Sequence, residues 1–424
     1  MRKIDRKKVI SFSPVKLMGF VFFLYTLGNF CVPMLQWNER FVQIPLYLLF
    51  LTCLFHFKID FELVKRFVFW YMPFIILCFV SLLYSPAFND SHDIVVSLIM
   101  AFFFGLSVSI FLSYEGALSY IKYSYILVSI YVGICLILTF QQKSWWSRLG
   151  ESFGMNENLV ALYFVISFSF TINELGSKKH LLINISSLLV STYVILLTGS
   201  KKALFAAVIY AFLFFILRAG KVTKRIRVIL ISSIALVVLF NLIMNVELLY
   251  NILGFRIQAM INTFVMHDFN SSSNSTGERA DMIIFGLNKF VYSPLWGWGL
   301  NAFRELYGNS TGHYAYAHNN YVEILADLGV IGFCSYYSIF NRMIYIIRRM
   351  GNRIRTFSFD VSLVFLIVFY DIAMVSYYDT RIIMLVMIAY SGLSKSLNNY
   401  RCEKNGRLSS TDASGSQGDV VKVE

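Results

Sequence analysis

The segment from Gly277 to Gly332 concentrates the residues of this chain that could do chemistry. It places an arginine, Arg279, a histidine, His318, and an acid, Glu323, between two apolar segments. An imidazole titrates near neutral pH and can accept a proton from a hydroxyl group, and a guanidinium can bind an anion through two parallel hydrogen bonds. The pattern therefore predicts proton transfer beside a bound anion.

Arg279 follows a Ser-Thr-Gly-Glu sequence that is typical of a helix start. Thr276 is the predicted N-cap, and the apolar residues that follow recur at helical spacing, which predicts an amphipathic helix along the membrane surface. Arg279 then lies in the first turn, where the helix dipole disfavours a cation but favours a bound anion. The alternative is a surface arginine that pairs with Glu278 or Asp281.

The residues around His318 predict a polar site at a membrane edge. His318 and Asn319 precede Asn320, Glu323 and Asp327, which fall on one face of a predicted span. Acids inside a span are costly and usually face a cavity or a partner, so these groups could orient the imidazole. The alternative is a structural polar cluster, with His318 as a capping or water-facing residue.

Cations elsewhere in the chain could also meet a phosphate. Lys201 and Lys202 follow an apolar segment directly, and Arg256 begins a long polar loop. Lysine binds phosphate as a point charge, whereas arginine can bind it through two hydrogen bonds. Ordinary snorkelling of the two lysines to the membrane interface is the alternative.

Three weaker features complete the set of candidates. Pro294 ends the helix of Arg279, and Gly297 and Gly299 then allow either a tight turn or close backbone approach. His313 has the surroundings of an ordinary loop. Asp371 is a further acid within an apolar span.

The composition identifies an integral membrane protein. The 424 residues are 57% hydrophobic and only 14% charged, with a mean hydropathy of +0.63, whereas a soluble protein carries roughly 25% charged residues. The net charge of +13 comes from clusters beside apolar segments, which argues against a nucleic-acid partner. The six cysteines show no CxxC pattern and no metal-ligand spacing, so no metal site is predicted.

Twelve segments are apolar enough to be predicted as transmembrane helices. They lie near 15–37, 41–57, 67–85, 93–113, 119–140, 157–174, 181–199, 203–218, 228–248, 319–341, 358–378 and 380–396. With the N-terminus in the cytosol, every strongly basic loop falls on the cytosolic side, as the positive-inside rule requires. The fold class is therefore all-α and polytopic, with both termini cytosolic.

This topology divides the chain into five regions. They are a cytosolic N-terminus (1–14), nine spans (15–248), a large exterior loop with an amphipathic helix (249–318), three spans (319–396) and a disordered cytosolic tail (397–424). Since ATP and nucleotide sugars are cytosolic, chemistry at the exterior loop must use a substrate that arrives already activated.

Arg279, PLWGWG and HNNYVEILADLGVIG, in this order, resemble the conserved block of the O-antigen ligase and polymerase superfamily, which are bacterial membrane glycosyltransferases. The TGSKKAL turn resembles the serine–arginine motif of that family, with Lys201 and Lys202 where arginine is usual. The block covers about 60 residues, and it is specific for the superfamily but separates its members poorly.

The resemblance implies a C-type glycosyltransferase fold with one long periplasmic loop in the bacterial inner membrane. The donor would be an undecaprenyl-pyrophosphate-linked glycan, with no metal and no cofactor. Arg279 would bind the pyrophosphate and His318 would activate the acceptor hydroxyl, with inversion at the anomeric carbon. Lys201, Lys202, Arg256, Asn319, Asn320 and Glu323 would bind pyrophosphate or glycan. A chain-length regulator and a flippase are the implied protein partners.

Several functions fit this pattern. The segment after His318 looks closest to polymerases that join lipid-linked repeat units into O-antigen or capsule chains. A ligase that transfers finished polymer to the lipid A core, or a relative that glycosylates proteins, would use the same chemistry. A lipid-glycan transporter is the alternative from another class, and it would use Glu323, Asp327 and Asp371 for ion coupling.

Overall fold

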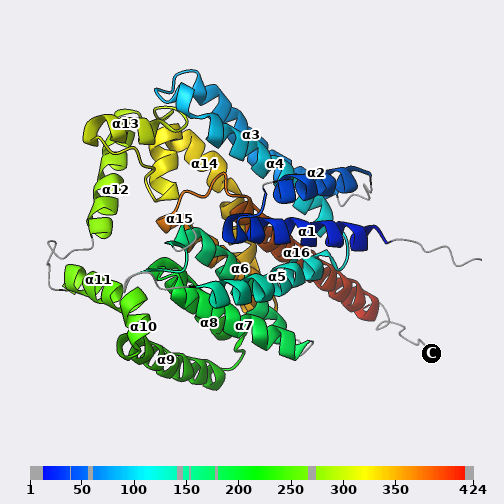
Figure 1. Ribbon diagram of the computed structural model, residues 1–424. Coiled ribbons are helices and arrows are strands. Elements are labelled where there is room, and N and C mark those ends of the chain that lie inside the picture. The colour runs from blue at the N-terminus through cyan, green and yellow to red at the C-terminus, as the bar shows by residue number, and fades with distance from the viewer. Residues whose placement is uncertain are drawn as a thin grey trace, which may run out of the picture. The chain divides into compact units, whose positions relative to one another are not determined.

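The computed structural model describes residues 13–38, 40–55, 61–140, 147–151, 154–176, 180–265 and 274–415, and these residues form helices joined by loops (Figure 1). The helices are α1 (Pro14–Leu35), α2 (Arg40–Phe55), α3 (Phe61–Leu82), α4 (His92–Leu112), α5 (Ala117–Thr139), α6 (Glu157–Leu175), α7 (Leu181–Leu197), α8 (Lys201–Arg218), α9 (Val222–Asn245), α10 (Glu247–Leu249), α11 (Phe255–Val265), α12 (Asn274–Tyr292), α13 (Ala302–Thr311), α14 (Asn320–Arg349), α15 (Ser358–Ala373) and α16 (Thr380–Gly415). Short 3₁₀ turns lie at Phe88–Asp90 and Gly351–Phe357, and a π-helical turn lies at Tyr250–Gly254.

Each of the twelve predicted spans coincides with a helix, namely α1 to α9 and α14 to α16. Within the described residues, 8 helices are long and apolar enough to cross a membrane, and α2 and α7 are shorter apolar helices. The all-helical, multi-pass membrane class is therefore confirmed. The number of twelve spans and the side on which each loop lies stay predictions.

The chain forms two compact units. The first unit consists of Met1–Phe69, Val96–Ala207 and Phe240–Glu278, and the second consists of Trp70–Val95, Val208–Leu239 and Arg279–Glu424. Lys201, Lys202 and Arg256 belong to the first unit. The other predicted site residues, from Arg279 onward, belong to the second.

In the first unit, α1 packs against α2 and α5, and α5, α6 and α7 pack against one another. Buried hydroxyl groups join the last three helices, because Ser129 lies 2.6 Å from Ser167 and Thr171 lies 2.9 Å from Ser187. Such hydrogen bonds hold apolar helices together where lipid supplies no hydrophobic drive.

In the second unit, α14 packs against α13, α15 and α16. The segment from Ile382 to Tyr390 of α16 is fully buried, which makes this helix a core element of the unit. Trp70, in the middle of α3, joins this helix to α14, since its indole N–H donates to the carbonyl of Tyr336 at 2.6 Å.

Two local predictions differ from the structure. The helix α12 begins at Asn274, so Thr276 lies inside it and is not the N-cap; Asn is itself a favoured residue at a helix start. The helix α16 continues to Gly415, into the polar tail that we predict from composition to be disordered. An ion pair of 2.6 Å between Arg353 and Glu403 accounts for part of this extension. The N-terminal residues 1–12 and the last residues 416–424 lie outside the described residues.

Candidate functional site

A break in α14 forms the base of the polar segment. Gly329 has a φ of +62°, which interrupts the helical hydrogen bonds. Two carbonyls before the break accept hydrogen bonds from the loop 294–301, and two N–H groups after it donate to the same loop, at 2.7 to 3.3 Å. The pairs are Trp298–Ala326, Gly299–Asp327, Val330–Pro294 and Ile331–Leu295. The loop and the broken helix are therefore joined backbone to backbone.

This close approach explains the glycines of the GWG sequence. Gly297 has a φ of +69°, and a Cβ atom there would collide with the backbone of Asp327. Gly299 has a φ of +99°, and its Cβ would lie 2.6 Å from the Cα of Ser85. Any residue with a side chain would be excluded at both positions. Of the two alternatives, the structure therefore shows close backbone approach as well as a turn.

Asp327 orders the residues that follow the loop. Its carboxylate accepts hydrogen bonds from the N–H groups of Asn301 at 3.0 Å and Phe303 at 2.7 Å, which are the first groups of α13. The side chain is only 1% exposed. A negative charge at a helix N-terminus stabilises the unpaired N–H groups there, so Asp327 positions α13 and not a ligand.

The segment that follows α3 holds the same loop from another side. The hydroxyl of Ser81 accepts from the N–H of Leu300 at 3.0 Å, and the hydroxyl of Ser85 donates to the Leu300 carbonyl at 2.7 Å. Tyr84 donates to the carbonyl of Trp296 at 3.0 Å. With polar contacts on two sides, the loop is a rigid frame and not a free surface segment.

The helix α12 packs against this frame through one face. Met282 lies in a buried cluster with Phe303 and Val322, and a Cβ atom at Gly286 would collide with the side chain of Val322. Arg279 is one turn from Met282 and two turns from Gly286, and therefore lies on the same face of α12. The packing directs Arg279 toward the loop that precedes α14.

The position of His318, just before α14, is fixed through the backbone of the preceding residue, Ala317. The carboxylate of Glu323, which is 1% exposed, accepts a hydrogen bond from the N–H of Ala317 at 2.6 Å. His318 itself has a φ of +54°, a left-handed conformation that is uncommon for residues other than glycine. Strained backbone of this kind concentrates at functional sites. Glu323 thus positions the imidazole through the main chain.

Tyr316 connects the two predicted catalytic residues. Its ring lies against the imidazole of His318, with centroids 4.1 Å apart and planes tilted by 47°. Burial raises the pKa of the Tyr316 phenol, the positive charge of Arg279 lowers it in part, and the charge of Glu323 raises it further. The phenol therefore stays protonated near neutral pH and lies within electrostatic reach of Arg279.

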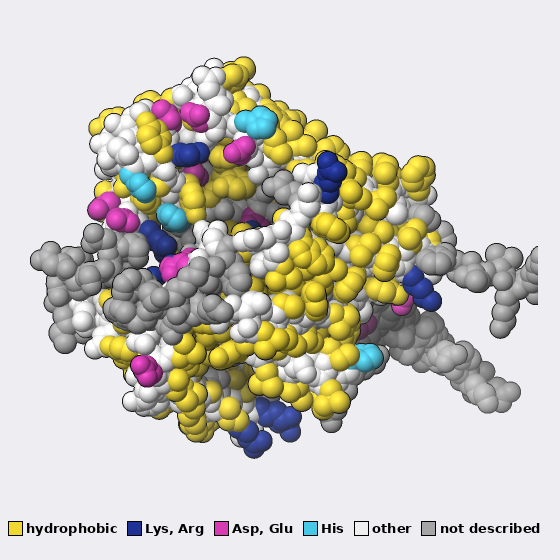
Figure 2. Space-filling view, in the orientation of Figure 1, with side chains coloured by type: hydrophobic (Ala, Val, Ile, Leu, Met, Phe, Trp, Pro, Cys, Tyr) yellow, Lys and Arg dark blue, Asp and Glu magenta, His cyan; other side chains and the backbone are white. Residues whose placement is uncertain are grey.

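Arg279 is half-buried and has no ion pair among the residues that the structure describes, so the predicted pairing with Glu278 or Asp281 is not seen there. Figure 2 shows acidic, basic and histidine side chains gathered over α12 and α13, while the surface over α3 is mainly apolar. His313 is exposed, and its N–H donates to the hydroxyl of Thr311 at 3.2 Å, as in an ordinary loop.

Asn319 and Asn320 have structural contacts. The Asn319 side chain caps α14 by accepting from the N–H of Val322 at 3.0 Å. Asn320 is fully buried, and its amide donates to the hydroxyl of Tyr337 at 2.9 Å. Its carbonyl oxygen accepts from two N–H groups of the loop after α15, those of Ser376 and Tyr377. This geometry favours a positioning role for Asn320 over direct contact with a glycan.

Asp371 completes the same network. It is fully buried and accepts hydrogen bonds from the hydroxyls of Tyr337, at 3.0 Å, and Ser376. Asn320 and Asp371 together tie the first turn of α14 to the end of α15. The acids predicted for ion coupling in a transporter, Glu323, Asp327 and Asp371, are therefore all engaged in holding the backbone or the core of the second unit.

In the first unit, the two lysines open α8 after a tight turn. Gly199 has a φ of +59°, and its Cβ would lie 2.8 Å from the carbonyl oxygen of Ile252. Ile252 lies four residues before Arg256, so the turn before the two lysines contacts the segment that leads to Arg256. All three cationic side chains predicted to bind substrate belong to this unit and are half-buried.

Arg148 is a further cation, beside the turn at Gly199. Its Cδ would lie 2.9 Å from a Cβ atom at Gly199. Its guanidinium pairs with Glu151 at 2.9 Å and with Glu157 at 2.7 Å. These two acids neutralise the charge of Arg148. We therefore assign Arg148 a structural role beside the turn after α7.

The sequence does not single out two tyrosines of this region, Tyr316 and Tyr378. Tyr316 contacts His318. Burial raises the pKa of the Tyr378 phenol, and Glu323 and Tyr316 add to the rise. The only local signal for Tyr316 is its place two residues before His318. Tyr378 lies 60 positions further on, and nothing in a single sequence connects the two.

Residues 186–337 match the family model described as O-antigen ligase. This part of the chain is therefore similar to the O-antigen ligase family. No curated protein is matched by the chain. The matched region contains every residue predicted to act on the substrate, which are Lys201, Lys202, Arg256, Arg279, His318, Asn319, Asn320 and Glu323. The similarity of residues 186–337 to this family agrees with the resemblance found in the sequence, and the apolar helices agree with a multi-pass membrane protein.

Proposed function

We propose that the chain is a polymerase that joins undecaprenyl-pyrophosphate-linked oligosaccharide repeat units into O-antigen or capsular polysaccharide. The reaction would take place on the exterior face of the bacterial inner membrane, with both termini of the chain in the cytosol. One observation carries the proposal: the ring of Tyr316 contacts the imidazole of His318 and lies within electrostatic reach of Arg279. A base and a cation therefore border one polar segment.

In the proposed reaction, the imidazole of His318 accepts the proton of an acceptor sugar hydroxyl. The hydroxyl oxygen attacks the anomeric carbon of the donor while the bond to the pyrophosphate oxygen breaks. Arg279 binds the departing pyrophosphate, whose negative charge grows as the bond lengthens. A fixed cation stabilises such a transition state more than the ground state. A single displacement with one base inverts the anomeric configuration.

The frame described above supports this division of roles. The carboxylates of Glu323 and Asp327 accept hydrogen bonds from backbone N–H groups. The two acids are therefore not arranged as the catalytic carboxylate pair of a glycosidase. The neutral phenol of Tyr316 can donate a hydrogen bond to a pyrophosphate or sugar oxygen. Lys201, Lys202 and Arg256 would add positive charge for the same lipid carrier, in keeping with the substrate-binding role predicted for them.

A polymerase is favoured over a ligase by the segment HNNYVEILADLGVIGFCSYY, which looks closer to polymerases, especially those of capsule type. Purified full-length protein in proteoliposomes should convert lipid-linked repeat units into a ladder of longer glycans and release the polyprenyl pyrophosphate. If the repeat units stay unchanged without any other enzyme present, the proposed polymerase is wrong.

A strain that lacks the gene separates polymerase from ligase. Loss of a polymerase leaves single repeat units attached to the surface lipid. Loss of a ligase leaves long chains on the polyprenyl carrier, and this outcome would move the assignment to the ligase.

A further inference from the structure

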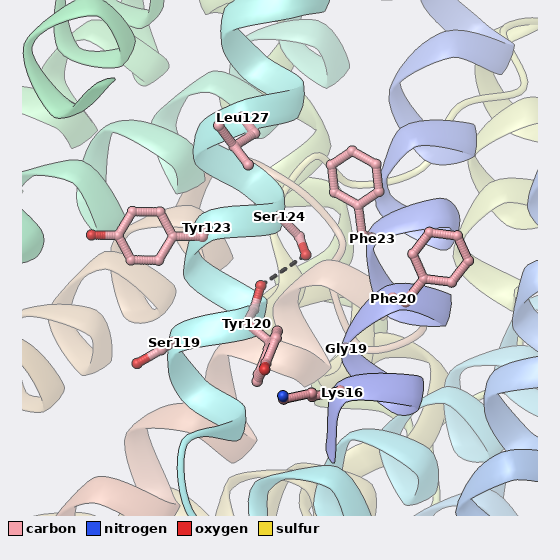
Figure 3. A pocket seen from close by; sticks show the side chains of 9 residues that line it. All are labelled: Lys16, Gly19, Phe20, Phe23, Ser119, Tyr120, Tyr123, Ser124 and Leu127. Atoms are coloured by element: carbon pink, nitrogen blue, oxygen red, sulfur yellow. Dashed lines mark hydrogen bonds between the residues drawn. The ribbon is translucent and has the colours of Figure 1, made fainter. Parts of the chain in front are cut away.

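A groove between α1 and α5 lies in the first compact unit, and none of the residues assigned to the reaction lines it. Its volume is about 370 Å³, which falls in the range of small-molecule sites in proteins. Figure 3 shows Lys16 pointing from α1 toward Tyr120 of α5 at one end of the groove, with Leu127 at the other end. Phe20 and Phe23 of α1 form the opposite wall.

The groove results from a close approach of two helices that run in the same direction. A Cβ atom at Gly19 would lie 2.5 Å from Cδ1 of Tyr120, so the ring of Tyr120 packs onto the bare backbone of α1. Lys16 lines the groove at the end that holds Ser119, and Phe23 lines it toward the end that holds Leu127. The two helices are therefore parallel. The N-termini of α1 and α5 therefore lie at the lysine end.

The walls of the groove are apolar and uncovered. Phe20 is 59% exposed, Leu127 is 43% exposed and Tyr120 is 37% exposed. Both helices are long and apolar enough to cross a membrane, so these side chains face hydrocarbon. A hydrocarbon chain is the occupant that fits walls of this kind.

The lysine end carries positive charge. Lys16 is exposed and forms no ion pair with any residue of the described ranges. Ser13, the N-cap of α1, makes no side-chain hydrogen bond to the helix that follows, and the N-cap of α5 is a glycine, Gly116, which has no side chain to make one. The positive ends of two helix dipoles and an ammonium group therefore favour an anion beside the apolar groove.

We propose that this groove binds an anionic glycerophospholipid, with one acyl chain along Phe20, Phe23 and Leu127 and the headgroup phosphate beside Lys16. With the predicted orientation of the chain, the lipid belongs to the cytosolic leaflet, where anionic headgroups meet basic residues at helix ends. The site does not depend on the proposed polymerase activity, since it uses none of the residues assigned to that reaction.

The test uses purified full-length protein in nanodiscs that contain phosphatidylglycerol with a photoactivatable group on one acyl chain. After illumination, peptide mass spectrometry should find the lipid attached to the segments 16–23 and 119–127. Lys16→Ala should lower this attachment about fivefold, since one basic residue contributes about that factor to anionic-lipid binding. Lys65→Ala is the matched control, because Lys65 is also exposed near the start of a membrane helix, and it should change nothing.

Two outcomes would overturn the proposal. Equal attachment of a photoactivatable phosphatidylcholine, with no effect of Lys16→Ala, would show ordinary boundary lipid. Displacement of phosphatidylglycerol by equimolar undecaprenyl phosphate would show that the groove belongs to the polyprenyl carrier. Narrowing the groove with Leu127→Trp gives a second measurement, and it should reduce attachment of phosphatidylglycerol even where Lys16→Ala lowers expression.

Discussion

The two cationic regions of the molecule differ in how their acids are used. In the second unit, the buried acids Glu323 and Asp327 accept hydrogen bonds from main-chain N–H groups, and Arg279 has no ion pair among the described residues. In the first unit, Glu151 and Glu157 pair directly with Arg148 beside the turn that leads to Lys201.

In the proposed function, this difference corresponds to a region that carries the chemical step and a region that binds the substrate. Glu323 and Asp327 hold the backbone next to His318 and at the start of α13, and neither forms an ion pair with Arg279. Acids that pair with an arginine compensate its charge and leave a weaker positive field, which lysines then supplement as point charges. We therefore expect substitutions in the second unit to lower the rate of the chemical step, and substitutions in the first to weaken substrate binding.

Among the substitutions that compare the two regions, Arg279→Ala is expected to lower the rate of polymer formation most. Arg279→Ala should lower the rate of polymer formation by roughly 100- to 1,000-fold, which is the usual effect of removing one group that stabilises developing charge. Arg304→Ala is the control, because Arg304 is an exposed arginine on α13, and its rate should stay within about twofold of wild type. Initial rates with purified protein in proteoliposomes measure both. Equal rates for the two variants would remove Arg279 from the chemistry.

Glu323 should show a smaller effect that depends on the replacement. Glu323→Ala leaves the Ala317 N–H without its acceptor and shifts His318, and small misplacements of a catalytic group cost up to roughly 100-fold in rate. Glu323→Gln keeps an acceptor oxygen and should lose about tenfold or less. A kcat that falls with KM unchanged, together with recovery in the glutamine variant, distinguishes positioning from loss of folding. If both variants are equally inactive, the charge of Glu323 has a direct role that the contacts do not predict.

The rigid frame can be tested by a pair of glycines. Gly297 and Gly312 both have positive φ, but only at Gly297 would a Cβ atom meet other backbone, and at Gly312 the space is open. Gly312→Ala should therefore cost about 1 kcal/mol of unfolding free energy, and Gly297→Ala several times as much. Thermal unfolding in detergent measures the difference. Similar melting temperatures for the two variants would mean that the loop 294–301 does not need its contact with α14.

The smallest effects are expected in the first unit. Lys202→Ala and Arg256→Ala should each raise KM for the lipid-linked donor by about five- to tenfold with little change in kcat, as for loss of one charged contact. Combining Lys202→Ala with Arg279→Ala sharpens the comparison, because two residues that contact the same part of a substrate give effects that are not additive. Strictly additive effects would mean that the two regions act on different parts of the substrate.

The sequence predicts the helices well because their signal is local. Apolar runs of sufficient length become helices whatever surrounds them, and all twelve predicted segments are helical. The break at Gly329 is not predicted, since a single glycine inside an apolar helix is usually tolerated. The break depends on the loop about 30 residues earlier, whose backbone groups replace the helical hydrogen bonds that are lost at Gly329. Only the folded structure brings this loop and Gly329 together.

The candidate site was also predicted only in part. Arg279, His318 and Glu323 could be predicted from the sequence because these polar residues interrupt an apolar chain. The buried position of Asn320 could not be predicted from the sequence, since its partners Ser376 and Tyr377 lie more than 50 residues away along the chain. Tyr316 is missed for another reason: a tyrosine near a membrane edge has an ordinary explanation, and only its contact with His318 makes it notable.

The most direct measurement compares two histidines of the same loop. Purified His318→Ala and His313→Ala proteins, each reconstituted with lipid-linked repeat units, should be followed over time by gel analysis of the glycan. Loss of a general base lowers a rate by roughly 100- to 10,000-fold, so His318→Ala should form no visible polymer, while His313→Ala should match wild type. Polymer formed by His318→Ala at the wild-type rate would contradict the account.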